Sequence, residues 1–239
     1  MQNKKVPTSA TNNSNSGHRK RLREKFLYGG GRALYDYEKL ELLLTYCIPR
    51  RDVKPLAKTL INHFGSIREL MNAPIEELTS IPGISENSGT LFILLKEFCT
   101  IYLEEKLQEK PLFENTGDVI NFARMKIGGN MRETYMILCL NARNQLINYE
   151  CFQEGDVDKT VLYCKTLAQL VLKHNAVSVI IIHNHPSGIC IPSENDLKAT
   201  VRITKALSAI DIILLDHIIV SSSDFHSMAA NDELPKMQR

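Results

Sequence analysis

The spacing of apolar residues changes once along this 239-residue chain, near residue 110. Before that point apolar residues recur at helical spacing, and residues 20–108 contain no pattern typical of a strand. Beyond it, short apolar or alternating runs predict strands at 135–140, 145–152, 177–182 and 212–220, with helices at 166–174 and 193–207. The expected fold class is therefore an α-helical N-terminal domain followed by an α/β C-terminal domain.

Composition places the boundaries of these domains. Residues 1–17 are rich in Asn, Ser and Thr, which predicts a disordered polar tail. The helical domain is expected at 18–108, and a charged segment with one proline predicts a linker at 109–115. The second domain is expected at 116–230, followed by a polar tail at 231–239.

Composition and cysteine spacing exclude several classes of protein. The longest apolar runs are far shorter than the ~18 residues of a membrane span, so no membrane partner is expected. The N-terminal segment lacks the apolar core of a signal peptide. The six cysteines form no C-x-x-C pair, which argues against a disulfide framework and against a four-cysteine zinc module. A reduced, cytoplasmic protein is the expectation.

The net charge of +2 conceals a basic N-terminal arm. Residues 1–26 contain seven Lys or Arg residues and one acidic residue, which leaves 22 basic and 26 acidic residues in the rest of the chain. Arg19, Lys20, Arg21 and Arg23 of this arm are candidate contacts to the phosphate backbone of DNA, independent of base sequence. The alternative is a solvated segment that keeps the protein soluble.

The segment Ile81-Pro82-Gly83-Ile84-Ser85 lies between two helical patterns and predicts a tight turn. Glycine permits close approach of a ligand to the backbone, and N–H groups at a helix start favour an anion. Gly83, Ile84 and Ser85 are therefore candidate DNA contacts. The alternative is a hairpin that serves only packing.

The strongest motif is His183-Asn184-His185-Pro186-Ser187-Gly188, followed by Ser193 and Asp196. Two histidines at i and i+2 at a strand end project from the same face. Asp196 falls in the first turn of the next helix, for which Ser193 is a favoured N-cap. Two histidines and one carboxylate leave a coordination position of tetrahedral zinc open, which is typical of catalytic sites. We therefore predict one Zn²⁺ per chain, held by His183, His185 and Asp196.

Three alternatives accompany this prediction. Cys190, in the loop between the ligands, could replace the carboxylate, since thiolates bind zinc well; otherwise it is an apolar loop residue. Ser193 could only cap the helix while the histidines belong to the core. Asp216-His217, inside the last predicted strand, is expected to be a structural pair or to support the ligands.

Together these motifs make the chain similar to the RadC family, whose C-terminal half is a JAMM/MPN-type zinc hydrolase domain. The resemblance covers residues 18–221 and rests on the segments 17–23, 81–84, 183–188, 192–196 and 215–217. It implies a helix-hairpin-helix N-terminal domain and a cytidine-deaminase-like sheet with helices. It also implies that Ser193 stabilises an oxyanion.

The resemblance further implies a function. Members of the wider superfamily cleave peptide and isopeptide bonds with a glutamate from an upstream strand as general base. Glu150 is the candidate for that base and Glu154 the weaker one; the alternative is that each is an ordinary exposed carboxylate. The implied activity is a metallopeptidase-type hydrolase acting on a peptide or protein.

One departure from the family pattern favours a different function. RadC relatives carry Pro-Arg-Glu before the His-Asn-His strand, where this chain has Cys164-Lys165-Thr166. Because Thr166 cannot act as a base near neutral pH, the alternative is a non-catalytic zinc-containing DNA- or protein-binding module linked to DNA repair. The open three-ligand set favours the enzyme. A nuclease is less favoured, because no acidic cluster accompanies the histidines.

Overall fold

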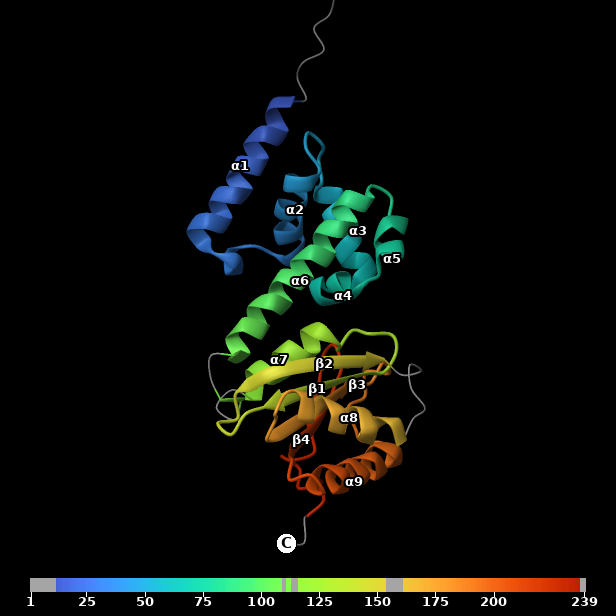
Figure 1. Ribbon diagram of the computed structural model, residues 1–239. Coiled ribbons are helices and arrows are strands. Elements are labelled where there is room, and N and C mark those ends of the chain that lie inside the picture. Colours follow the sequence, from blue (N-terminus) through green and yellow to red (C-terminus); the bar gives the residue numbers. More distant parts are fainter. Residues whose placement is uncertain (1–11, 109–110, 113–115, 154–160, 237–239) are drawn as a thin grey trace, which may run out of the picture. The chain divides into compact units, whose positions relative to one another are not determined.

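The computed structural model describes residues 12–108, 111–112, 116–153 and 161–236 (Figure 1). The chain divides into two compact units, residues 1–95 and 96–239. The first unit is helical and the second is mixed α/β, which confirms the predicted fold class. Among the described residues, no helix is long and apolar enough to span a membrane.

The first unit is built from short helices around one apolar core. Large side chains from five of the helices are buried in it, among them Leu44, Leu60, Leu70, Leu78 and Phe92. The elements are α1 (Asn12–Gly29), a 3-10 turn (Gly31–Ala33), α2 (Asp36–Cys47), α3 (Lys54–Phe64), α4 (Ile67–Asn72), α5 (Ile75–Ser80) and the beginning of α6 (Glu86–Gln108).

Two boundaries differ from those expected from composition. Residues 12–17, predicted to be disordered, are helical and belong to α1, while residues 1–11 lie outside the described residues. The division between the two units falls inside α6, between Leu95 and Lys96, rather than at the predicted linker. The physical reason is that Leu103 and Leu107 of α6 pack into the core of the second unit. Most of the linker, 109–110 and 113–115, lies outside the described residues.

The second unit is a five-stranded sheet with the order β2-β1-β3-β4-β5. Only the β3–β4 pair is parallel; β1–β2, β1–β3 and β4–β5 are antiparallel. The predicted strands are present, whereas α7 and β5 have no counterpart in the sequence prediction. The elements are α7 (Thr116–Lys126), β1 (Thr134–Leu140), β2 (Leu146–Gln153), α8 (Val161–Lys173), β3 (Ser178–Asn184), α9 (Glu194–Ser208), β4 (Ile213–Val220) and β5 (Phe225–Ser227).

Helices cover both faces of this sheet, α7 on one and α8 with α9 on the other (Figure 1). Successive side chains of a strand point to opposite faces. Ile180 and Ile182 of β3 therefore join the core on the α7 side, and Val179 and Ile181 join the core on the α8/α9 side. The same alternation turns His183 toward α8 and α9.

A close backbone approach joins the end of α7 to the end of β4. A Cβ atom on Gly128 would lie 2.8 Å from the main-chain oxygen of Ser221 and 2.6 Å from that of Arg124. The side chain of Arg124 donates a hydrogen bond to the main-chain oxygen of Ser222 at 2.8 Å. Glycine at 128 is therefore a steric requirement of this contact.

We predict that Gly128→Ala lowers the free energy of unfolding by about 1–3 kcal/mol, because the backbone must shift to admit a methyl group. The matched control is Gly117→Ala in α7, where a Cβ atom meets no other atom within 4 Å. That change should be neutral or slightly stabilising, since alanine favours a helix. Urea denaturation of both variants measures the difference. Equal stabilities would contradict the steric explanation.

Candidate metal centre

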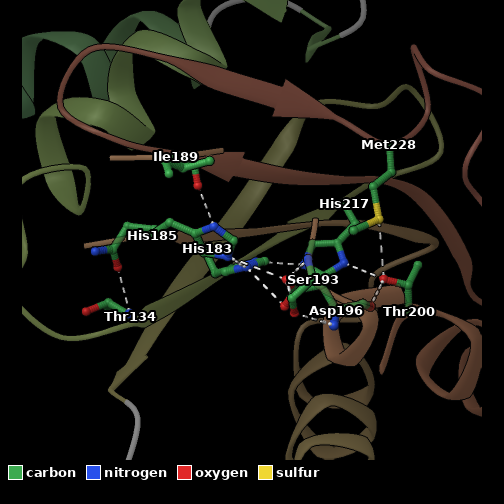
Figure 2. Close-up of polar contacts among 10 residues, drawn as sticks. Thr134, His183, His185, Ile189, Ser193, Asp196, Thr200, His217 and Met228 are labelled. Carbon is green, nitrogen blue, oxygen red and sulfur yellow. Dashed lines mark hydrogen bonds and ion pairs between the residues drawn. The ribbon is translucent and has the colours of Figure 1, made fainter. Parts of the chain in front are cut away.

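The two histidines of the motif lie at the end of β3 and share one face of the sheet (Figure 2). His183 pairs with Tyr135 of β1 in the antiparallel register, and the two rings stack with centroids 4.9 Å apart. His185 follows the strand, and its main-chain N–H donates to the main-chain oxygen of Val220 at 3.0 Å. The end of β4 therefore holds His185 in place.

Asp196 reaches the histidines from the first turn of α9. Ser193 is the N-cap of this helix, as predicted, and accepts a hydrogen bond from the main-chain N–H of Asp196. In return the Asp196 carboxylate accepts from the Ser193 N–H at 2.7 Å and from the Ser193 hydroxyl at 2.6 Å. This reciprocal capping box fixes both the start of the helix and the carboxylate.

The donor atoms of these three residues converge on one point. The Nε2 atoms of His183 and His185 are 3.1 Å apart, and they lie 3.3 and 3.5 Å from the two carboxylate oxygens of Asp196. Two donors that each lie about 2.0–2.1 Å from a tetrahedral zinc ion are about 3.4 Å apart. The spacing of the three ligands therefore fits a single metal ion, as the sequence motif predicted.

The second nitrogen of each histidine ring is held by another group. The Nδ1 atom of His185 donates to the main-chain oxygen of Ile189 at 2.7 Å, since a carbonyl oxygen can only accept. The Nδ1 atom of His183 lies 2.9 Å from Nε2 of His217 in β4. Metal-binding histidines are commonly oriented in this way by a partner on the other nitrogen.

Burial and neighbouring charges set the protonation of the groups at the centre. Burial lowers the pKa of His217 to about 3, so its ring is neutral at physiological pH. Burial raises the pKa of Asp196, but its interactions with His183 and Ser193 outweigh this effect and hold the pKa well below the usual value. Asp196 is therefore an ionised ligand, and the positive end of the α9 dipole favours that charge.

A pocket of about 420 Å³ opens beside Asp196, one of the three candidate ligands. Ser193, His217 and Glu133 also line it. Its remaining lining is partly apolar, with two cationic side chains from α9: Tyr135, Ile137, Leu167, Ile181, Asn195, Lys198, Ala199, Arg202 and Ile203. A molecule bound in this pocket would therefore contact Asp196 of the candidate metal site.

Glu133 is a carboxylate in the pocket lining that the sequence analysis did not name as a candidate. It directly precedes β1, and the antiparallel register that pairs Tyr135 with His183 carries Glu133 to the level of His185. Asn184 stands between the two histidines in the sequence and is buried. Its side chain accepts a hydrogen bond from the main-chain N–H of Thr134 at 2.7 Å and donates one to the main-chain oxygen of Asn130 at 2.9 Å. The middle residue of the His-Asn-His motif thus fixes the backbone next to Glu133. A glutamate at the start of a predicted strand was the only signal in the sequence.

Glu150, the predicted general base, lies elsewhere. Glu150 is on the edge strand β2, where it pairs with Ile137 of β1. Its carboxylate lies 3.3 Å from Nζ of Lys173 and 3.7 Å from Nε2 of His174. Lys173 is the last residue of α8 and His174 follows it, so neither belongs to the group of three candidate ligands. Glu133, and not Glu150, lines the pocket that Asp196 also lines. Glu154, the weaker candidate, lies outside the described residues.

Among the remaining candidates of this half, only His217 contacts one of the candidate ligands. The thiol of Cys190 is buried with Ile219 and Met228, burial raises its pKa, and it does not join the three-residue group. Thr166 lies in α8 and does not line the pocket. The Asp216-His217 pair is split by strand alternation: Asp216 accepts from the Ser227 hydroxyl and the Ala229 N–H, whereas His217 faces His183.

The predicted DNA contacts belong to the first unit, and several of them make hydrogen bonds or ion pairs with other residues of that unit. Arg19 donates to the main-chain oxygen of Ile48, and Lys20 lies 3.9 Å from Glu24. Arg21 and Arg23 are exposed on α1. In the hairpin between α5 and α6, the N–H of Ile84 donates to Ile81 and that of Ser85 to the Ser88 hydroxyl. DNA binding by these residues stays a prediction.

The α/β sheet and its His-His-Asp group define a domain of the JAB type, which is a metallohydrolase-type fold. The RadC-like JAB domain matches residues 113–234, and the UPF0758 N-terminal domain matches residues 15–89. This chain belongs to the RadC-like UPF0758 family, which confirms the resemblance seen in its motifs.

Two curated relatives extend over almost the whole chain. A UPF0758 protein of Fusobacterium nucleatum is 37% identical over 220 residues, which cover 89% of this chain and 95% of the relative. A UPF0758 protein of Ruegeria pomeroyi is 35% identical over 206 residues, which cover 86% of this chain and 92% of the relative. The similarity therefore includes both units.

We predict that the purified protein binds about one transition-metal ion per chain and that His185→Ala abolishes this binding. Cys190→Ser is the control and should leave the metal content unchanged, because its thiol packs away from the ligands. Elemental analysis after dialysis against chelator-free buffer measures the stoichiometry. Loss of the metal in the cysteine variant would contradict the ligand assignment.

Proposed function

We propose that this protein is a zinc-dependent hydrolase of peptide or isopeptide bonds. The observation that supports this best is the group of three candidate ligands beside a pocket: the ligand atoms of His183, His185 and Asp196 lie within 4.8 Å of one another, and Asp196 lines the same pocket as Glu133 and Ser193. A structural zinc site has four protein ligands, whereas a catalytic one keeps a position for water or substrate. Three ligands beside a pocket favour the catalytic alternative.

Zinc suits this ligand set because imidazole nitrogen and carboxylate oxygen are its common ligands in tetrahedral sites. When bound, the ion supplies Lewis acidity: it lowers the pKa of water and polarises the carbonyl group to be attacked. Two neutral imidazoles and one carboxylate leave a net positive charge on a divalent ion, which supports that role.

Glu133 is the general base in this proposal. It takes a proton from the attacking water and returns it to the nitrogen that leaves, so that the amide bond breaks without releasing a free amide anion. Its position at the beginning of β1, held through Thr134 and Asn184, keeps its carboxylate on the pocket side of the ligands. The absence of a carboxylate at Thr166 does not then prevent hydrolysis.

Ser193 stabilises the oxyanion that forms during attack. In the structure its hydroxyl donates to Asp196 at 2.6 Å, and the residue also lines the pocket. Rotation of the hydroxyl toward the pocket directs the same proton to the developing negative charge. The Ser193 main-chain N–H continues to hold Asp196 during this change.

We predict that Glu133→Gln lowers the hydrolytic turnover of the zinc-loaded protein by ~10²–10⁴-fold while its zinc content is unchanged. Glu150→Gln is the matched control and should leave turnover unchanged, because Glu150 contacts Lys173 and His174 instead. Cleavage of a mixed peptide library and of lysine isopeptides, followed by mass spectrometry, gives the readout. A loss of activity in the Glu150 variant alone would restore the original assignment of the base.

A second candidate function, sequence-independent DNA binding by the first unit, is favoured by one observation. Gly83 has a φ of 102°, which glycine adopts readily, and the guanidinium nitrogens of Arg51 lie 3.4 Å from where its Cβ atom would be. An exposed arginine beside a glycine turn suits a phosphate group. This activity is compatible with hydrolysis by the second unit.

For this second function we predict weak binding that falls steeply with salt, because it depends on neutralised phosphates. Replacing the exposed pair Arg21 and Arg23 by glutamine should reduce the slope of log K against log salt by roughly 2. Arg143→Gln, in the second unit, is the control. Fluorescence anisotropy with duplexes of unrelated sequence measures both. Sequence-selective or salt-insensitive binding would contradict the proposal.

A further inference from the structure

We propose that Thr200 and His217 form a positioning relay that sets the tautomer of His183 before a metal ion binds. The inference rests on the metal centre of the proposed function but not on its hydrolytic activity. Neither residue is a metal ligand in the arrangement described above. Together they connect the Nδ1 atom of His183 to a main-chain oxygen of α9 through side chains that are almost completely buried (Figure 2).

The relay begins at a main-chain oxygen that can only accept. The Thr200 hydroxyl lies 2.7 Å from the main-chain oxygen of Asp196, one helical turn earlier in α9, and donates to it. A hydroxyl group has one proton, so Thr200 must accept from its other close partner, Nδ1 of His217 at 2.6 Å. The thioether of Met228, 3.4 Å away, is a weaker acceptor and does not compete for the hydroxyl proton.

The direction of this first bond determines the next two. If His217 donates through Nδ1, its neutral ring carries a lone pair on Nε2. That lone pair lies 2.9 Å from Nδ1 of His183 and accepts its proton. The Nε2 atom of His183, which faces His185 and Asp196, is then the nitrogen that a metal ion can use.

The opposite direction would obstruct metal binding. If the Thr200 hydroxyl donated to His217, then His217 would donate from Nε2 to His183, and the proton of a neutral His183 would lie on the ligating nitrogen. Thr200 and His217 are each 1% exposed and His183 is not exposed at all, so their polar atoms depend on partners within the protein. The Asp196 carbonyl therefore selects the direction that leaves His183 free to ligate.

One residue of α9 thus serves the centre in two ways. The side chain of Asp196 is a ligand, and its main-chain oxygen orients the relay that prepares His183. Because both groups belong to the same turn of the helix, the capping box at Ser193 fixes them together. This arrangement explains why a threonine is buried on α9 opposite a histidine of β4.

The test compares Thr200→Val, which keeps the shape of the side chain but removes the hydroxyl, with Thr200→Ser, which keeps the hydroxyl. Zinc affinity is measured by competition with a chromophoric chelator. We expect the valine variant to bind zinc ~10–100-fold more weakly, since loss of the partner that orients a ligand typically has this effect. The serine variant should bind zinc within about threefold of the unaltered protein, because a serine hydroxyl can make the same two hydrogen bonds.

A second readout detects the proton itself. Long-range ¹H–¹⁵N spectra of the histidine rings distinguish a proton on Nδ1 from one on Nε2. We expect His217 to carry its proton on Nδ1 in both the metal-free and the zinc-loaded protein and in Thr200→Ser. In metal-free Thr200→Val the proton should move to Nε2, where His183 can accept it.

Two results would overturn the relay: zinc affinity of the valine variant equal to that of the unaltered protein, or a proton on Nε2 of His217 in the unaltered metal-free protein. The second result decides the question even if Thr200→Val does not fold. Both readouts are independent of turnover. A protein with the expected zinc affinities and tautomers but without peptidase activity would contradict the proposed function and leave the relay intact.

Discussion

The complete burial of β3 is the constraint on which the rest of the second unit depends. All seven residues of this strand are buried, so apolar side chains must cover both faces and every polar group must find a partner inside the protein. Val179 and the three isoleucines that follow it meet the first requirement. At the end of the strand, Asn184 meets the second requirement by binding Thr134 and Asn130, and His183 meets it through His217 and Asp196. The polar centre is therefore the point at which the buried strand leaves the apolar core.

The second organising feature is the start of α9. A helix leaves its first N–H groups without partners, and a capping box satisfies two of them with a serine and an acidic residue. Here the acidic residue is also a candidate metal ligand, so helix formation and assembly of the centre use the same hydrogen bonds. A bound cation would further stabilise a carboxylate that the helix dipole already favours. The parallel crossover from β3 to β4 places this helix end beside the histidines.

The position of the proposed general base shows which information strand prediction alone does not contain. Glu150 lies on the correct face of the sheet by strand alternation, but its strand is at the edge, and β1 separates it from the histidines. Because neighbouring strands are ~4.8 Å apart, a group two strands away lies well beyond hydrogen-bond reach of the metal ligands. Glu133, next to the strand that pairs directly with β3, is the carboxylate that the register brings to the pocket.

The sequence by itself determined the features that depend on local geometry. The change from helical to strand periodicity predicted a helical unit followed by an α/β unit. The spacing of His183, His185, Ser193 and Asp196 predicted the candidate metal site. These four residues lie within fourteen positions, on a strand end, a loop and a capped helix, so local geometry is enough to bring them together. Tertiary structure decided what distant segments contribute. Glu133 lies 50 residues before the first histidine and His217 lies 34 residues after it, and only the order and register of the strands bring them together. Strand pairing is a non-local interaction that leaves no fixed spacing in the sequence, so Glu133 was found only in the folded sheet. For His217, the sequence suggested either a structural role or support of the ligands, and the register of β3 and β4 shows that it contacts His183.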